Sequence, residues 1–98
     1  LRKVLAQFPQ RSEVYVRLAT VYEKQNRLAE ALELLARALT LREVNRAPVY
    51  NQLGIVYWRL KRYPESIQAA RQAINADPNL LDAYLTLGIT YEDSGQQQ

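Results

Sequence analysis

Cysteine, histidine and methionine are absent from this sequence of 98 residues, and glycine and proline occur only three and four times. Without Cys and His the chain offers no disulfide, no thiolate nucleophile, no imidazole base and no Cys/His metal site. We therefore expect no cofactor, and the compartment cannot be read from redox chemistry. No apolar run approaches the roughly 18 residues that a membrane-spanning helix needs, so no membrane insertion is expected. The scarcity of Gly and Pro predicts short loops.

The residues that are abundant favour helices. Ala, Leu, Arg, Gln and Glu dominate, and no alternating run of β-branched residues suggests a strand. The hydrophobic fraction of 48% is ordinary for a globular protein, and the length suffices for one domain at most. The chain starts at Leu1 without an initiator Met or a basic-then-apolar leader, so we expect a segment of a longer protein.

Charge is distributed unevenly along the chain. Residues 1–71 hold all 13 Lys and Arg and six of the ten acids, a net charge of +7. Residues 72–98 hold four acids and no base, a net charge of −4. The two ends of the chain are therefore expected to carry opposite electrostatic fields.

The tyrosines repeat at a fixed spacing. Tyr15 recurs as Tyr50 and Tyr84, after 35 and then 34 residues, and each is followed seven residues later by another Tyr. Each pair encloses a Leu and a small residue, which gives the motif Tyr-x-x-Leu-Ala/Gly-x-x-Tyr at 15–22, 50–57 and 84–91. Seven residues make two helical turns, so Tyr, Leu and Tyr share one helix face. The small residue beside the Leu would let another helix approach closely.

A second helix face follows the first motif in each complete unit. Its small and aliphatic residues are spaced by four and three, at Ala31, Leu35 and Ala38 and again at Ser66, Ala70 and Ala73. Two amphipathic helices in a period of about 34 residues predict a helix–turn–helix repeat. Helices are expected at about 1–8, 12–25, 28–43, 47–60, 64–76 and 81–94. The four prolines (Pro9, Pro48, Pro64 and Pro78) all fall at these boundaries, with Ser12 as a candidate N-cap and Gly95 as a C-terminal stop.

This pattern resembles the tetratricopeptide repeat family over nearly the whole chain. The match is close in Leu53-Gly54-Ile55-Val56-Tyr57 through Ala73 and in the Asp77-Pro78-Asn79 turn, and mild departures are Ala19 for Gly, Ser66 for Ala and Glu43 for the closing Pro. The resemblance implies an all-α, right-handed α-solenoid of antiparallel helix pairs. It also implies a single domain over 1–98, in which 1–11 end a preceding repeat, 12–46 and 47–80 are repeats, and 81–98 are the first helix of another.

The resemblance further implies that binding residues lie on the first helix of each pair, which lines the concave side of the superhelix. The tyrosine face fixes the phase of each first helix, so the opposite face can be named. It presents Glu13, Val16, Arg17, Thr20 and Lys24, then Asn51, Gln52, Ile55, Trp58 and Arg59, and then Asp82, Leu85, Thr86, Ile89 and Asp93. The proposed partner-binding set within it is Val16, Arg17, Thr20, Asn51, Gln52, Ile55, Trp58, Arg59, Leu85, Thr86 and Ile89.

Two interpretations of this face stay open for Trp58, the only Trp. Trp is enriched among interface hot spots, so Trp58 is a candidate anchor, but it could instead cover a neighbouring helix. A subfamily of these repeats grips a C-terminal carboxylate with Lys, Asn and Arg. The matching places here hold Val16, Thr20, Gln52, Asp82 and Thr86, so such a clamp is not expected.

Other classes of function find little support in the sequence. Tyrosine side chains are expected to pack between helices, which leaves none of them beside the basic residues to stack on nucleotides. These tyrosines include Tyr15, Tyr22, Tyr57, Tyr84 and Tyr91. Arginines and lysines are spread among acids, and no nucleic-acid partner is expected. The carboxylate pairs Glu30/Glu33 and Glu92/Asp93 have no His or Cys beside them, so no enzyme activity is expected.

We therefore predict a scaffold without catalytic activity that binds a peptide or helix of a partner protein in its concave groove. The groove would be anchored on Trp58, Ile55 and Leu85 and oriented by Asn51, Gln52 and Arg17. The alternative is a self-assembly element that stacks head to tail, because the basic and acidic ends attract and repeat arrays have apolar ends.

Overall fold

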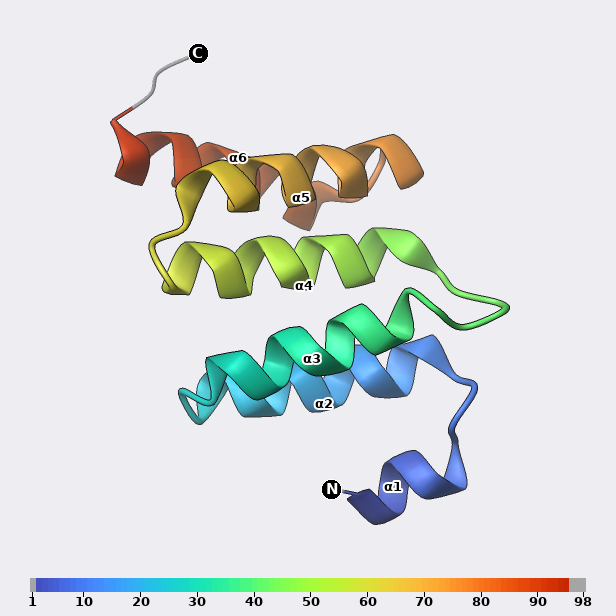
Figure 1. Ribbon diagram of the computed structural model, residues 1–98. Coiled ribbons are helices and arrows are strands. Elements are labelled where there is room, and N and C mark those ends of the chain that lie inside the picture. The colour runs from blue at the N-terminus through green and yellow to red at the C-terminus, as the bar shows by residue number, and fades with distance from the viewer. Residues whose placement is uncertain (1, 96–98) are drawn as a thin grey trace.

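The computed structural model describes residues 2–95, and helices and short connections make up all of this range. The helices are α1 (Arg2–Gln7), α2 (Ser12–Lys24), α3 (Leu28–Ala38), α4 (Arg46–Arg59), α5 (Tyr63–Ala76) and α6 (Leu81–Ser94), shown in Figure 1. The pattern of good helix formers with a 34-residue period therefore folds as expected.

The helices form two layers of antiparallel neighbours. α2, α4 and α6 contact one another in succession, while α3 packs against α2 and α4, and α5 packs against α4 and α6. Figure 1 shows the helix pairs stacked one above another, from α1 at the N-terminal end to α6 at the C-terminal end. The array measures 43 × 27 × 18 Å, so it is an elongated piece of solenoid in which the first helices of successive pairs make one face.

The predicted small-residue face supplies the contact between layers. Ala31, Leu35 and Ala38 of α3 are fully buried, as are Ala70 and Ala73 of α5. Small side chains at these positions bring the helix axes close, so that larger groups from α4 interdigitate with them. Val49 and Val56 of α4 are likewise fully buried, which places α4 at the centre of the core.

The turns inside the helix pairs share one backbone conformation, a residue with positive φ. Asn26 and Lys61, 35 residues apart, both have a positive φ (64° and 61°), and the backbone nitrogen that follows each donates to the carbonyl of a motif tyrosine, Tyr22 or Tyr57. Gly95, 34 residues after Lys61, takes the same conformation (φ 78°) and ends α6, as its sequence position predicted. The left-handed conformation terminates the first helix of each unit at the same point of the repeat.

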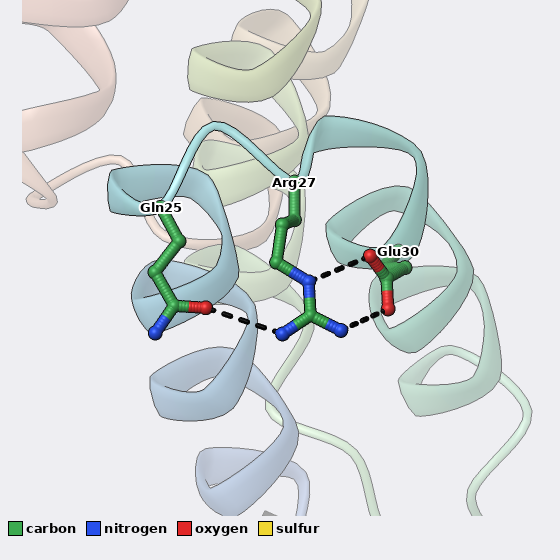
Figure 2. Close-up of polar contacts among 3 residues, drawn as sticks. All are labelled: Gln25, Arg27 and Glu30. Carbon is green, nitrogen blue, oxygen red and sulfur yellow. Dashed lines mark hydrogen bonds and ion pairs between the residues drawn. The ribbon is translucent and has the colours of Figure 1, made fainter.

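Arg27 forms hydrogen bonds to residues on both sides of the turn between α2 and α3. Figure 2 shows Arg27 between Gln25 and Glu30: its Nε and Nη2 donate to the two carboxylate oxygens of Glu30 at 2.8 and 2.5 Å, and its Nη1 donates to Gln25 at 3.3 Å. The guanidinium lies over the Tyr22 ring at 4.5 Å from its centroid. This hydrogen-bonded ion pair lowers the pKa of Glu30 below its ordinary value and raises that of Arg27.

The next unit repeats this arrangement with Arg62, which donates to Glu65 and lies over the Tyr57 ring. Its hydrogen bond lowers the pKa of Glu65. The period of the chain therefore extends beyond the hydrophobic pattern to the polar groups at each turn.

Two expectations about helix ends were wrong. α3 ends at Ala38 rather than near residue 43, because the chain turns there and the Thr40 hydroxyl donates to the Arg37 carbonyl at 2.7 Å. Leu41 and Val44 of the connection nonetheless pack against the core, which is why the segment had a helix-like hydrophobic pattern. Ser12 is the first residue of α2 rather than its N-cap, and its hydroxyl accepts a hydrogen bond from the Asn45 backbone nitrogen at 3.3 Å.

The motif tyrosines pack as expected at Tyr15 and Tyr91, which are buried, and partly at Tyr22 and Tyr57. Tyr84 differs, because 46% of its surface is exposed. Its hydroxyl still donates to the carbonyl six residues earlier, that of Pro78, as Tyr15 does to that of Pro9. The local hydrogen bond is thus a property of the motif, whereas burial of its first tyrosine varies: Tyr15 packs in a core cluster with residues of α3, and no helix after α6 covers Tyr84 among residues 2–95.

Candidate functional site

A hollow of about 370 Å³ lies between α4 and α6, on the face formed by the first helices of the pairs. Its lining consists of Asn51, Gln52, Ile55 and Trp58 from α4 and of Asp82, Leu85, Thr86 and Ile89 from α6. These residues recur at helical spacings of three and four, which is why both helices direct them to one side. All eight belong to the face that the tyrosine phase predicts to be concave.

The floor of the hollow is polar and closely bonded. Thr86 and Asn51 are both about nine-tenths buried, and the Thr86 hydroxyl donates to the Asn51 carboxamide oxygen at 2.8 Å. The same hydroxyl also lies 3.0 Å from the Asp82 carbonyl one turn earlier in α6. Asn51 therefore joins α4 to α6, and the oxygen expected to orient a partner already accepts a hydrogen bond within the protein.

Gln52 lies beside Asn51 and is 7% exposed. Its Nε2 is the one buried side-chain nitrogen or oxygen without a hydrogen-bond partner in the part of the chain that the structure describes. A buried donor without a partner costs about 1–3 kcal/mol. The hollow thus contains one polar group whose hydrogen-bonding capacity is unused.

The walls of the hollow are apolar and accessible. Leu85 and Ile89 of α6 expose 54% and 45% of their surfaces, and Ile55 of α4 is partly exposed. The Trp58 indole closes one end, where its Nε1 donates to the Asp93 carboxylate at 2.6 Å. That bond holds the Trp58 indole, which comes from α4, against the last turn of α6. Trp58 therefore both covers the neighbouring helix and lines the hollow.

Four residues of the predicted set lie outside the hollow. Val16, Arg17 and Thr20 are on α2, one repeat earlier, and the Thr20 hydroxyl donates to the Val16 carbonyl at 2.9 Å. Arg59 turns toward α2, where it donates to the Asn26 carboxamide oxygen and the Glu23 carbonyl, both at 3.0 Å, and forms an ion pair with the Glu23 carboxylate. Arg59 therefore joins two repeats and does not face the hollow.

Residue spacing alone did not reveal a second connection between elements. Ser66 is fully buried: its hydroxyl donates to the Gly54 carbonyl at 2.7 Å and lies 2.9 Å from the Thr90 hydroxyl. Thr90 in turn donates to the Thr86 carbonyl at 2.8 Å. The Ser that departs from the family's Ala thus links α4, α5 and α6 behind the hollow, and its partner Thr90 was the signal that could have indicated it.

Comparison with known proteins bears on the class of this helix-pair solenoid. A tetratricopeptide repeat profile matches residues 10–79. The chain therefore belongs to the tetratricopeptide repeat family, and its family marks it as a scaffold for protein–protein interaction.

Among solved structures, the chain is similar to one described as the crystal structure of MamA, with a TM-score of 0.80 and 27% sequence identity. The match covers 97% of this chain and 55% of that one, so the chain spans about half the length of MamA. A search of curated proteins gives no match.

Two kinds of feature are absent from residues 2–95. None of the helices there is long and apolar enough to cross a membrane. These residues also hold no group of three or more acidic, His or Cys side chains arranged to bind a metal ion.

Proposed function

We propose that the hollow between α4 and α6 binds a peptide or helix of a partner protein, and that the chain acts by presenting this preformed surface without chemistry. The observation that carries the proposal is the agreement between the helix face predicted from the sequence and the hollow present in the fold. The tyrosine phase in the sequence selected a face, and seven of the eleven selected residues line one hollow in the fold. A scaffold family supplies the context for such a surface.

The physical basis of binding would be apolar burial. Leu85, Ile89 and Ile55 leave aliphatic surface in contact with water inside a concave site, where one partner side chain can cover all three. Each Å² of apolar surface removed from water contributes about 25 cal/mol. Trp58 adds a large ring held in place by Asp93, and a ring that is already ordered loses little entropy when a partner covers it.

Trp58 also supplies the assay, because it is the only Trp in the chain. A phage-displayed library of random peptides would be selected on the folded protein, and the selected peptides synthesised and titrated while Trp58 fluorescence is followed. We expect a change in that fluorescence on binding. Leu85→Ala should weaken binding by at least about 2 kcal/mol, as expected for a hot spot, and leave the fold intact because the side chain is more than half exposed.

Val21→Ala is the matched control: it removes a similarly exposed aliphatic side chain from α2, outside the hollow, and should leave affinity unchanged. Trp58→Ala is a second test; because this variant has no Trp, its binding is measured by calorimetric titration, with circular dichroism to establish that the helices remain. If selected peptides bind Leu85→Ala and Trp58→Ala as tightly as they bind the parent protein, the assignment to this hollow is wrong.

The second candidate function is head-to-tail self-assembly. It rests on the exposed apolar side chains at the two ends of the array, Val4 and Phe8 on the basic side and Leu81 and Tyr84 on the acidic side. Such heterologous contacts between copies extend into rings or filaments. Light scattering against protein concentration at low and high salt tests it, and a monomer at high concentration and low salt would rule it out.

A further inference from the structure

The polar and charged groups of the hollow restrict the kind of peptide it can hold. Gln52 Nε2 is a buried donor that lacks a partner, whereas the Asn51 oxygen and the Thr86 hydroxyl are bonded to each other. This nitrogen has almost no exposed surface in the free protein, so a rotation of the Gln52 side chain would bring it to an acceptor on the occupant, and every residue of a peptide offers a backbone carbonyl. A bond from Gln52 to such a carbonyl would hold the peptide main chain on the floor of the hollow.

The charge of the hollow has one sign. Asp82 is the only charged residue in its lining, and it is exposed and close to Leu85 in the helix. Asp93 adds a second carboxylate at the Trp58 end. Arg59 follows Trp58 in the chain but forms an ion pair with Glu23, so it does not neutralise the Asp82 and Asp93 carboxylates. The occupant therefore meets an apolar cleft with a carboxylate near each end.

We propose that this hollow is specific for peptide segments in which an aliphatic or aromatic side chain is followed, within two residues, by Lys or Arg. The apolar side chain fills the cleft between Ile55, Leu85 and Ile89, a backbone carbonyl accepts from Gln52 Nε2, and the basic side chain reaches Asp82 or Asp93. Acidic segments are disfavoured, because a like charge beside these carboxylates is repelled. This specificity rests on the proposed function of the same hollow.

The basic preference is tested by the composition of the peptides that the random library yields. We expect Lys and Arg to be enriched next to apolar residues and Asp and Glu to be depleted. For a selected peptide, Asp82→Asn should weaken binding about 1.5- to 5-fold at low salt, the range of an exposed ion pair, and the loss should shrink as salt is added. Glu92→Gln is the control: it removes a charge from the same helix outside the hollow and should have a smaller effect.

The role of Gln52 has a signature that a structural role does not share. Gln52→Leu keeps the approximate size of the side chain and removes the unpaired donor, so the free protein should be as stable as the parent or more stable. Peptide affinity should nevertheless fall about 2- to 10-fold, the range for one neutral hydrogen bond. A parallel loss of stability and affinity would show that Gln52 acts through the fold alone.

The outcomes separate the two proposals. If the library yields no peptide whose binding depends on Leu85 and Trp58, both the groove function and its specificity are overturned. If such peptides are found but are acidic or neutral, or if Asp82→Asn and Gln52→Leu bind them as the parent does, the groove function stands and the specificity for apolar–basic segments is wrong.

Discussion

Gly54 and Gly88 occupy the same position of successive repeats, yet replacement by Ala should stabilise the protein only at Gly88. Both lie inside helices, where Ala is favoured over Gly by about 0.8–1.0 kcal/mol. A Cβ at Gly88 would meet nothing within 4 Å. Gly88→Ala should therefore realise the full gain in the free energy of unfolding.

At Gly54 the added Cβ would lie 3.2 Å from Thr86 Cγ2 and 3.4 Å from the Ser66 carbonyl oxygen, with the Ala70 nitrogen at 3.6 Å. Backbone on one side and a buried, bonded Thr on the other leave little room to yield. Overpacking a core of this kind costs about 1–3 kcal/mol, which offsets the helix propensity or exceeds it. Gly54→Ala should thus be between neutral and about 2 kcal/mol destabilising, and should lie at least about 1 kcal/mol below Gly88→Ala.

Urea denaturation followed by both circular dichroism and Trp58 fluorescence measures the difference. For a domain of this size, 1 kcal/mol corresponds to a shift in Tm of about 4–8 °C. Hydrogen exchange of the α6 amides adds a local measurement, because stability in repeat arrays varies between units. Ala19, fully buried at the same position of the first repeat, is the internal control, and Ala19→Gly should destabilise. A Gly88→Ala variant that is destabilised as much as Gly54→Ala would refute the reasoning and would indicate that another surface packs on α6 there.

Three further predictions concern the turns and the connection between repeats. Lys61→Gly should raise stability by about 0.5–1 kcal/mol in thermal unfolding. A non-Gly residue at positive φ costs about 1–2 kcal/mol, which Gly avoids, but Gly loses more conformational entropy on folding, and this offsets part of the gain. The arginine-paired carboxyls of Glu30 and Glu65 have lowered pKa values in the folded state, so their contribution is present above the ordinary Glu pKa of about 4.3 and is lost as the pH falls through the lowered values. The double variant Glu30→Gln/Glu65→Gln should accordingly show a flatter decline of stability below that pH in acid titrations. Arg59→Met should cost about 1–3 kcal/mol in urea denaturation because it leaves the largely buried Glu23 carboxylate unpaired, and adding Glu23→Leu should recover much of the loss.

The sequence was sufficient for much of the fold because the repeat encodes it locally. Five of the six helices begin and end within about two residues of the positions expected from the tyrosine period and the prolines. The exception, α3, was overextended because Leu41 and Val44 contact the core from a connection without helical backbone. Hydrophobic spacing identifies residues that are buried, and it does not distinguish a helix from a loop that packs against one.

The candidate site was predictable to a different degree. Helical phase alone grouped the residues of the hollow, since one face of α4 and one of α6 must point the same way in a stacked array. The partners of each polar group were beyond the sequence. Asn51 meets Thr86 and Arg59 meets Glu23 across 35 and 36 residues, and such pairs depend on the angle between repeats, which no local spacing specifies.

The side-chain connections between first helices differ in kind along the array. α2 and α4 are joined near their C-terminal ends by the ion pair of Arg59 with Glu23, whereas α4 and α6 are joined by two hydrogen bonds from neutral donors, Thr86 to Asn51 and Trp58 Nε1 to the Asp93 carboxylate. Salt screens an ion pair more than a hydrogen bond from a neutral donor, and the largely buried Glu23 carboxylate moderates that screening. The contact between α2 and α4 should therefore depend on ionic strength more than the contact between α4 and α6 does. The hollow between α4 and α6 lies in the part of the array that depends less on salt, so we expect its shape to change little with ionic strength.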